Sequence, residues 1–449
     1  MRAVHETVVA LSTPPGRGGI AVIRITGPQA LECAQQVFIA SASTQIEPRE
    51  SIFGRFRLHS SGHIIDEGFL TYHKSGRSYT GEDLVELSCH GSPTVVGLLL
   101  EELLAAGAQA ASPGEFTYRA LLHGRIDLAQ AEGIRDLINA PSAQAARVAG
   151  EQARGALSQR LERMREELIS LIAEAEASLE FGEEPDVRER GGQRAGRIAA
   201  LANQIAAFVG SYRQGRLLRE GARVVLAGRP NAGKSTLFNA LLRSERAIVS
   251  EVPGTTRDFL SERIDLDGIP VSLVDTAGLR QIDAGIEAEG VRRSRAEMRG
   301  ADLVVLLIPC GEQPIDEDRA ILDAMGDRVI PAASKCDLGE ASSIAGGVAL
   351  SARTGDGLDQ LRAAIFTRLA GVESLSGSEL VITEARHHDA LRRAASRLEA
   401  AAAVFAQGMT EEIWLADLHA ALQSLGEITG QVPIEGLYDR IFNTFCIGK

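Results

Sequence analysis

The chain has 449 residues, more than one hydrophobic core usually organises, so its length predicts about two to four domains. Aliphatic residues are plentiful and aromatic residues make up only 4%, which favours a soluble α/β or helical protein over an all-β one. A net charge of −13 argues against broad, unspecific binding to nucleic acid, which needs cations to replace the phosphate counterions. Any RNA contact is therefore expected to be local or shared with a partner.

The N-terminal segment has no basic start, long apolar middle or small-residue cleavage site, so it does not resemble a signal peptide. No apolar run approaches the length of a membrane span. The cysteines are odd in number, scattered and never in a CxxC pair, which argues against disulfides and a zinc site. We therefore expect a cytoplasmic protein. The cysteines are Cys33, Cys89, Cys310, Cys336 and Cys446.

The basic residues are strongly biased, with 43 arginines and only four lysines. A lysine that persists against this bias indicates a position that needs a compact ammonium group instead of a planar guanidinium. The four are Lys74, Lys234, Lys335 and Lys449.

The first 120 residues predict an α+β domain. Short apolar strands are expected at residues 19–26 and 84–88, with a helix near residues 92–106 and Gly/Pro punctuation between them. From residue 128 to 179 the chain is rich in Ala, Glu and Arg with apolar residues at helical spacing, which predicts one long amphipathic helix. After an acidic break at residues 181–192, a second helix is expected to run to about Glu220.

Between residues 223 and 371, apolar strands alternate with helical stretches, which predicts a mostly parallel sheet with helices on both faces. From Thr383 onward, Ala/Leu/Arg-rich helices return. The predicted fold is therefore an α/β P-loop domain inserted into an α-helical domain and preceded by an α+β domain. The expected segments are residues 1–120, 121–216, 217–375 and 376–449.

The sequence GRPNAGKS at residues 228–235 lies between an apolar strand and a helical stretch, the context that a P-loop requires. Its backbone N–H groups are expected to wrap phosphates, Lys234 to reach the β and γ oxygens, and the Ser235 hydroxyl to bind Mg²⁺. A Gly-rich turn is the alternative, and the strand-to-helix context disfavours it. Nucleotide contacts are expected from Asn231, Ala232, Gly233, Lys234, Ser235 and Thr236.

Two further motifs follow in the order typical of GTPases. PGTTRD carries Thr255 and Thr256, where a threonine of the first switch completes the Mg²⁺ shell and senses the γ-phosphate. DTAG begins with Asp275 at the end of a strand, as in a Walker-B element. Predicted Mg²⁺ ligands are Ser235 and Thr256; the nucleotide contacts from these segments are Ser250, Thr255, Thr256, Asp275, Thr276, Ala277 and Gly278.

The sequence SKCD at residues 334–337 stands where the guanine-reading NKxD motif is expected, and SAR at residues 351–353 matches the second base-reading loop. Asp337 would accept both N–H groups of the guanine edge, which adenine does not offer. Ser334 replaces the usual Asn, and its shorter side chain predicts weaker contacts to the base and to the P-loop. Predicted base contacts are Lys335, Asp337, Ser351, Ala352 and Arg353.

The residue after DTAG is Leu279, which cannot orient the attacking water as the Gln of many small GTPases does. Another polar group must therefore serve. The following loop offers Asp283, Glu287 and Glu289, and its glycines allow it to move. The residue types give no reason to prefer one of the three acids for this role, and surface acids are usually solvated without any role in catalysis.

Taken together, the motifs resemble the MnmE (TrmE) family of tRNA-modification GTPases. The resemblance covers essentially the whole chain, and the order of the motifs is more specific than any one of them apart from the P-loop. The matching segments are STPPGRGGIAVIRITGP, TGEDLVEL, CHG, PGEFTYRA, IDLAQAEGIRDLI, GRPNAGKS, PGTTRD, DTAGLR, LSARTG and IFNTFCIGK.

This resemblance implies an N-terminal folate-binding domain, an inserted G domain and a helical domain built from both flanking segments. It also implies a homodimer formed through the N-terminal domain and a complex with the flavoprotein MnmG (GidA). That complex adds an aminomethyl or carboxymethylaminomethyl group at C5 of the wobble uridine (U34) of certain tRNAs. The one-carbon unit comes from a methylene-tetrahydrofolate, and 5-formyl-tetrahydrofolate is the related ligand.

The resemblance also assigns residues. It places a K⁺ site, which would stabilise developing charge on the phosphates, on Asn231, Ser250, Val252 and Thr255. It places the catalytic acid on Glu287. Folate contacts fall on Arg24, Glu86, Arg125 and Lys449.

Arg125 stands where relatives commonly carry Lys, a change that preserves the charge. Without the family resemblance, an arginine at the surface and a glutamate at a strand end would be equally reasonable interpretations of these residues. Cys446 is either a small apolar core residue or a nucleophile at the folate mouth.

A second function class remains open, namely a regulatory GTPase of ribosome assembly. GRGG at residues 16–19 formally satisfies the GXXG of a KH domain, although the basic helix that KH domains need is missing nearby. Folate binding discriminates the two functions, because an assembly factor has no use for it. A structural coiled-coil scaffold is disfavoured by the intact Lys234, Ser235 and Asp275.

Overall fold

The structure is a computed structural model that divides into two compact units. The first comprises Met1–Arg135, Gln152–Glu162 and Leu425–Lys449, and the second comprises Asp136–Glu151 and Arg163–Ser424. The described residues are 6–41, 46–58, 61–181, 185–244, 261–275, 296–339, 346–370, 380–407, 411–432 and 436–449.

The first unit contains a seven-stranded sheet with the order β3-β4-β5-β6-β2-β1-β7. Neighbouring strands are antiparallel except for β1 and β7, which run parallel. The strands are β1 (Val8–Leu11), β2 (Gly18–Thr26), β3 (Phe38–Ala40), β4 (Ser51–Arg57), β5 (Ile64–His73), β6 (Leu84–Gly91) and β7 (Gln109–Ala110). The strands expected at residues 19–26 and 84–88 are thus confirmed as β2 and β6.

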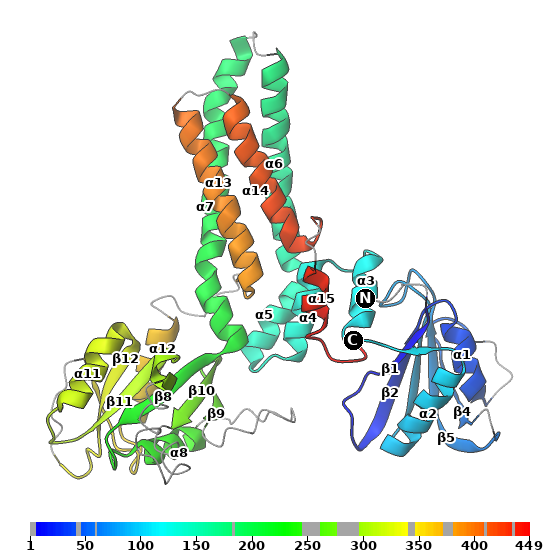
Figure 1. The fold of residues 1–449 in the computed structure, drawn as a ribbon, viewed down its shortest axis with the longest axis horizontal. Coiled ribbons are helices and arrows are strands. Elements are labelled where there is room, and N and C mark those ends of the chain that lie inside the picture. The colour runs from blue at the N-terminus through cyan, green and yellow to red at the C-terminus, as the bar shows by residue number, and fades with distance from the viewer. Residues whose placement is uncertain are drawn as a thin grey trace. The chain divides into compact units, whose positions relative to one another are not determined.

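Helices α1 (Ala30–Val37) and α2 (Pro93–Ala105) cover one face of this sheet. Alternate residues of β2 point into the shared core, where Ile23 and Ile25 are fully buried. This alternation is the period-2 pattern of a strand with one covered face. The helix expected near residues 92–106 is confirmed as α2, and the α+β prediction holds for this part of the chain (Figure 1).

The C-terminal residues belong to the first unit. Helix α15 (Leu437–Phe442) packs against α3 (Glu115–Leu122) and α4 (Leu128–Ile138) through aromatic contacts such as Tyr118 with Phe442. Beyond α15, Gly448 lies against β1, where a Cβ would collide with the carbonyl oxygen of Leu11. Ser12 donates its hydroxyl to the Gly448 carbonyl at 3.0 Å. The terminal Lys449 is therefore held at the end of β1.

The single helix expected over residues 128–179 is wrong, because the structure divides this stretch into α4, α5 (Ala143–Ala153) and α6 (Ala156–Phe181). Pro141 lies at the first break, since proline disfavours helical geometry in the residue before it. Gly155, with a φ of 88°, lies at the second. The break expected at residues 181–192 is shorter than predicted, since α7 (Pro185–Glu220) already begins at Pro185.

Four long helices that belong mainly to the second unit lie side by side, namely α6, α7, α13 (Ala385–Ala406) and α14 (Glu411–Thr429) (Figure 1). Arg197 of α7 pairs with two glutamates of α6, Glu167 and Glu174, at 2.7 Å each. Arg219 of α7 pairs with Glu384 at the start of α13 at 2.9 Å. Helices from both sides of the nucleotide domain therefore form one bundle, as predicted.

The nucleotide domain has a six-stranded sheet with the order β13-β12-β11-β8-β10-β9. All neighbours are parallel except β9 and β10, so the mostly parallel sheet is confirmed. The strands are β8 (Ala222–Gly228), β9 (Ser261–Leu266), β10 (Ile269–Asp275), β11 (Leu303–Pro309), β12 (Val329–Ser334) and β13 (Val348–Ala349).

Helices α8 (Lys234–Ser244) and α12 (Leu358–Ala370) pack on one face of this sheet, and α11 (Asp316–Met325) packs on the other. Strand β8 is central, with β10 on one side and β11 on the other. In such sheets, ligands bind beyond the carboxyl ends of the strands where the strand order reverses. The P-loop, which directly follows β8, lies at this point.

The nucleotide domain is tied to the bundle at the start of β8. Arg216, near the end of α7, pairs with Asp302, directly before β11, at 3.0 Å. Ser142, just before α5, donates its hydroxyl to the carbonyl of Gly268 in the β9–β10 turn at 2.9 Å. Within the described part of the chain, no helix has the length and apolar character to cross a membrane.

Candidate functional site

The P-loop connects β8 to α8 through a tight turn. Gly228 (φ 136°), Asn231 (φ 62°) and Gly233 (φ 96°) all adopt positive φ values. A Cβ at Gly228 would collide with the carbonyl oxygen of Leu307 in β11, so only glycine fits there. This backbone curvature turns successive N–H groups toward one centre, which is the arrangement that binds phosphate.

Lys234 begins α8 and is 6% exposed. Its ammonium donates to the carbonyl oxygens of Gly228 (2.7 Å) and Arg229 (2.8 Å). These contacts keep the ammonium over the concave side of the loop. A cation in this position can neutralise phosphate oxygens that the loop binds.

The Ser235 hydroxyl donates to the Asp275 carboxylate at 2.7 Å, and this carboxylate ends β10. A hydroxyl and a carboxylate are ligands of the kind that Mg²⁺ takes together with substrate phosphates. No group of three or more His, Cys, Asp or Glu side chains with metal-binding geometry occurs among the described residues. The pair therefore fits an ion that also depends on the nucleotide for its ligands.

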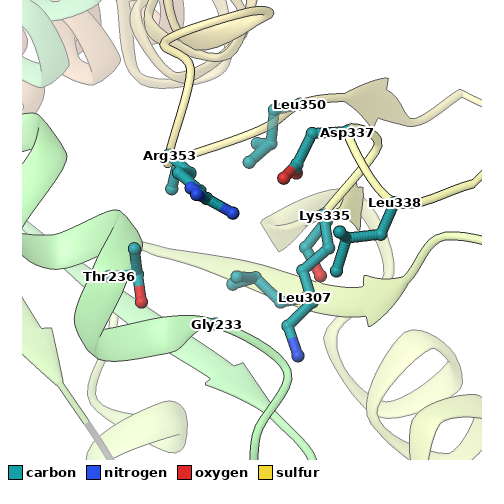
Figure 2. A pocket seen from close by; sticks show the side chains of 10 residues that line it. Gly233, Thr236, Leu307, Lys335, Asp337, Leu338, Leu350 and Arg353 are labelled. Atoms are coloured by element: carbon teal, nitrogen blue, oxygen red, sulfur yellow. The ribbon is translucent and has the colours of Figure 1, made fainter.

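A cavity of about 170 Å³ lies beside the P-loop, over the ends of β11, β12 and β13. Figure 2 shows the Asp337 carboxylate and the Arg353 guanidinium both directed into this space. The lining residues are Gly233, Thr236, Leu307, Ser334, Lys335, Asp337, Leu338, Leu350, Ala352 and Arg353. The apolar members suit a flat ring, and the carboxylate suits an edge with N–H donors.

Asp337 is oriented by Ser351, whose hydroxyl donates to Oδ1 at 2.8 Å. The two predicted base-reading loops are therefore joined by a hydrogen bond between side chains. Lys335 adopts a φ of 61°, and its stem passes 4.0 Å from the position a Cβ on Gly233 would take. Its aliphatic part thus lies between the base cavity and the P-loop (Figure 2).

Ser334 is buried, and its hydroxyl donates to the carbonyl oxygen of Ala232 in the P-loop at 2.7 Å. The shorter side chain was expected to weaken this contact, yet the hydroxyl reaches the loop. The reason is the sheet, which places the end of β12 close enough for a serine to span the gap.

Three leucines of the cavity, Leu307, Leu338 and Leu350, were not predicted from the sequence. Leu338 directly follows Asp337, the predicted base reader, and is 73% exposed, so this apolar side chain fills no core. Several predicted residues lie outside the described residues. They are Ser250, Val252, Thr255, Thr256, Thr276, Ala277, Gly278, Asp283, Glu287 and Glu289.

A second cluster of charges lies in the first unit, around Glu86 of β6. Arg24 of β2 pairs with Oε1 of Glu86 at 2.7 Å, and His73 of β5 lies 3.8 Å from Oε2. Burial lowers the pKa of the Lys449 ammonium, and the nearby Arg24 guanidinium lowers it further. The structure therefore brings together Arg24, Glu86 and Lys449, three of the four predicted folate residues.

The fourth folate residue, Arg125, lies against a neighbouring loop. Its Nη1 donates to the Gly76 carbonyl at 3.4 Å. The Arg24 guanidinium carbon lies over the ring of Tyr79, which belongs to the same loop, at 6.0 Å from the ring centre. Arg24 and Lys449 lie near Glu86, and Arg125 lies against the neighbouring loop, so cations are available for an anionic ligand.

Cys446 is exposed, so the apolar-core reading of this residue is wrong. The turn after α15 places it at the surface of the first unit, three residues before Lys449.

Family models match both halves of the chain. The model of the TrmE N-terminus, described as a GTP-binding protein, matches residues 7–125, and the model of the MnmE helical domain matches residues 128–446. The chain belongs to the MnmE (TrmE) family.

Two full-length relatives carry the name tRNA modification GTPase MnmE. The one from Roseiflexus sp. is 42% identical and aligns over 99% of both chains. The one from Alkalilimnicola ehrlichii is 43% identical, over 99% of this chain and 100% of the relative. The family resemblance expected from the motifs is thus confirmed over the whole length.

Proposed function

We propose that this chain is a potassium-activated GTPase of tRNA modification. It hydrolyses GTP and acts with the flavoprotein MnmG on the wobble uridine (U34) of certain tRNAs. There it adds a carboxymethylaminomethyl or aminomethyl group at C5, with a methylene-tetrahydrofolate as the one-carbon donor. The supporting observation is a guanine-type base site joined to a P-loop, in a chain whose relatives are named tRNA modification GTPases.

Base selection rests on Asp337. With Oδ1 held by Ser351, the carboxylate faces the cavity and accepts the ring N–H and the amino N–H of guanine. Adenine offers an acceptor at the corresponding ring position, so a carboxylate oxygen would face another acceptor instead of a donor. Lys335 and Leu338 flank the plane of the base.

Phosphate binding rests on the P-loop N–H groups and Lys234. The ammonium exchanges its loop carbonyls for the β and γ oxygens and stabilises the charge that develops as the terminal phosphate leaves. Ser235 would hold Mg²⁺, assisted by Asp275 and Thr256. The ion, when bound, neutralises charge on the phosphate oxygens.

Hydrolysis needs a group that positions water, and we assign this role to Glu287. Leu279 offers no hydrogen bond, whereas Glu287 occupies the position of the catalytic acid in the family. We assign K⁺ to Asn231, Ser250, Val252 and Thr255, of which the described Asn231 lies in the strained part of the P-loop. A monovalent cation there would supply the charge that other GTPases take from an arginine.

The charge cluster of the first unit is the proposed folate site. Oε1 of Glu86 accepts from Arg24, so Oε2 remains directed toward His73 and is the candidate acceptor for the pterin N–H groups. Arg24, Arg125 and Lys449 provide cations for the glutamate tail of 5-formyl- or methylene-tetrahydrofolate. The proposed domain division is residues 1–120, 121–216, 217–375 and 376–449, with a homodimer formed through the first segment.

Nucleoside analysis of tRNA from cells that lack this protein tests the proposal. Loss of the C5 modification at the wobble uridine, restored by the wild-type gene, is the expected result. An unchanged uridine would instead favour the alternative, a regulatory GTPase of ribosome assembly. Direct binding of 5-formyl-tetrahydrofolate to the purified chain gives an independent decision between the two.

A further inference from the structure

Two cysteine side chains meet beneath the base-reading loop. Cys310 directly follows β11 and Cys336 lies two residues beyond β12, at the carboxyl ends of neighbouring parallel strands. Their Sγ atoms are 3.2 Å apart, and both residues are partly accessible. The remaining cysteines are elsewhere in the chain, so this is a specific pair of thiols at the nucleotide site.

The backbone at this pair is well fixed. The Cys310 N–H donates to the Ser334 carbonyl at 2.7 Å, which extends the ladder between β11 and β12 by one bond. The two Sγ atoms already approach to 3.2 Å, about 1 Å more than the length of an S–S bond. The two thiols are therefore within reach of a disulfide after only a local adjustment.

We propose that Cys310 and Cys336 form a reversible disulfide that weakens guanine nucleotide binding, a regulation that rests on the proposed GTP site. Cys336 stands between Lys335 and Asp337, both of which line the base cavity. Joining the sulfurs shortens their 3.2 Å separation by about 1 Å. Cys310 directly follows β11 and is tied to β12 by its N–H, whereas Cys336 lies two residues beyond the end of β12, so the loop that contains Cys336 takes up the movement.

That movement acts on every described contact of the base-reading loop. Asp337 would shift relative to Ser351, which orients it, and Lys335 would shift relative to the P-loop. The Ser334 carbonyl accepts a hydrogen bond from the Cys310 N–H, while the Ser334 hydroxyl donates one to the Ala232 carbonyl. A displacement of this size spoils a two-point hydrogen bond to a base, because both N–H···O contacts require close alignment.

The oxidant is hydrogen peroxide. The Cys310 sulfur attacks one peroxide oxygen, the O–O bond breaks, and Cys310 becomes a sulfenic acid with release of one water. The Cys336 sulfur then attacks the Cys310 sulfur, the S–S bond forms, and the S–O bond breaks with release of a second water. Two thiols thus pass two electrons to one peroxide.

The pKa of the Cys336 thiol is raised, first by burial and then by its neighbour Cys310, which supports Cys336 as the second and not the first nucleophile.

The test uses the full chain, hydrogen peroxide and a fluorescent guanine nucleotide. Non-reducing peptide mapping should show a Cys310–Cys336 linked peptide. Nucleotide affinity should fall roughly tenfold to a hundredfold, as expected for loss of one hydrogen bond to a charged group. Dithiothreitol should reverse both changes.

The decisive variant is Cys310→Ser, with Cys310→Ala as a second version. Cys310 does not line the cavity, so either variant should bind nucleotide like the reduced wild type and show no response to peroxide. Cys33→Ala, which removes a buried thiol of the first unit, should keep the full response.

Three results would overturn the proposal. They are absence of the linked peptide at doses that oxidise the exposed Cys446, a linked chain with unchanged affinity, and a peroxide effect that persists in Cys310→Ser. Failure of the reduced wild type to bind GTP would instead reject the proposed function, and peptide mapping still reports on the sulfurs in that case.

Discussion

The Ser334 hydroxyl donates to the carbonyl oxygen of Ala232 across 2.7 Å, which joins the end of β12 to the P-loop. Both residues are buried, so water cannot replace this bond if it is lost. The predicted base-reading and phosphate-binding segments are thus joined by the Ser334 hydroxyl, at a position where asparagine is usual.

Ser334→Ala should therefore weaken GTP binding. It leaves a buried carbonyl without its donor, which costs about 1–3 kcal/mol and corresponds to an affinity loss of roughly fivefold to 150-fold. Ser334→Asn should tighten binding modestly or leave it unchanged. Isothermal titration with GTP measures both, and wild-type affinity in Ser334→Ala would contradict the coupling.

Asp337→Asn should reduce GTP affinity and shift preference toward xanthine nucleotides. Xanthine replaces the amino donor of guanine with a carbonyl, which the new amide N–H can satisfy. The asparagine oxygen can still accept from Ser351, so the loop should stay in place. Competition between GTP and XTP is the measurement, and an unaltered ratio would show that Asp337 does not read the base.

Glu287→Ala should lose roughly 10²–10⁴-fold in kcat, the usual contribution of a group that handles the attacking water. GTP affinity should hardly change, because the glutamate is assigned no contact in the ground state. Asp283→Ala and Glu289→Ala are matched controls from the same loop and should be mild. Single-turnover hydrolysis in K⁺ buffer compares the three, and a large loss in either control would move the role to that residue.

GTP hydrolysis should be much faster in K⁺ than in Na⁺ at constant Mg²⁺. The proposed site offers oxygens of Asn231 and of the loop at residues 250–255, a set suited to a larger, weakly hydrated cation. K⁺ should also promote G-domain dimerisation, since an ordered first switch offers a face to its symmetry mate. Asn231→Ala should reduce the difference between the salts, whereas equal wild-type rates would reject the site.

Binding of 5-formyl-tetrahydrofolate should depend on Arg24 and Lys449. Arg24→Ala should weaken it about tenfold through loss of a charged hydrogen bond, while the exposed Lys74→Ala should have no effect. The pKa of Lys449 is lowered from its usual 10.5, chiefly by burial. The ammonium is charged below this pKa and neutral above it.

Affinity for the anionic glutamate tail of the folate should therefore be highest near neutral pH and should fall as the pH rises through the lowered pKa of Lys449. The loss should begin at lower pH than for an ordinary lysine. Lys449→Arg should keep its charge and show a flat profile. Equilibrium titrations across this pH range provide the measurement, and identical profiles for the two chains would exclude Lys449 from the site.

The nucleotide site was largely predictable from the sequence. In a mostly parallel sheet, the carboxyl ends of the strands meet at one edge, so motifs that each follow a strand converge whatever their separation along the chain. The P-loop, Asp275, the loop after β12 and the loop after β13 all do so. The lysine bias added a second signal, since Lys234, Lys335 and Lys449 all lie at candidate sites.

Other relationships depended on the tertiary structure. The helix predicted over residues 128–179 is interrupted, because apolar periodicity continues through backbone breaks that Gly155 permits. The approach of Lys449 to Arg24 follows from the packing of α15 on α3, which brings together segments that are far apart in the sequence.

The pairing of Cys310 with Cys336 depends on the choice of β12 as the neighbour of β11. Local pattern determines which residues follow a strand, and so the sequence alone identified the nucleotide motifs. Which strands become neighbours is decided by the packing of the whole sheet, so side-chain contacts between loops appear only in the folded chain.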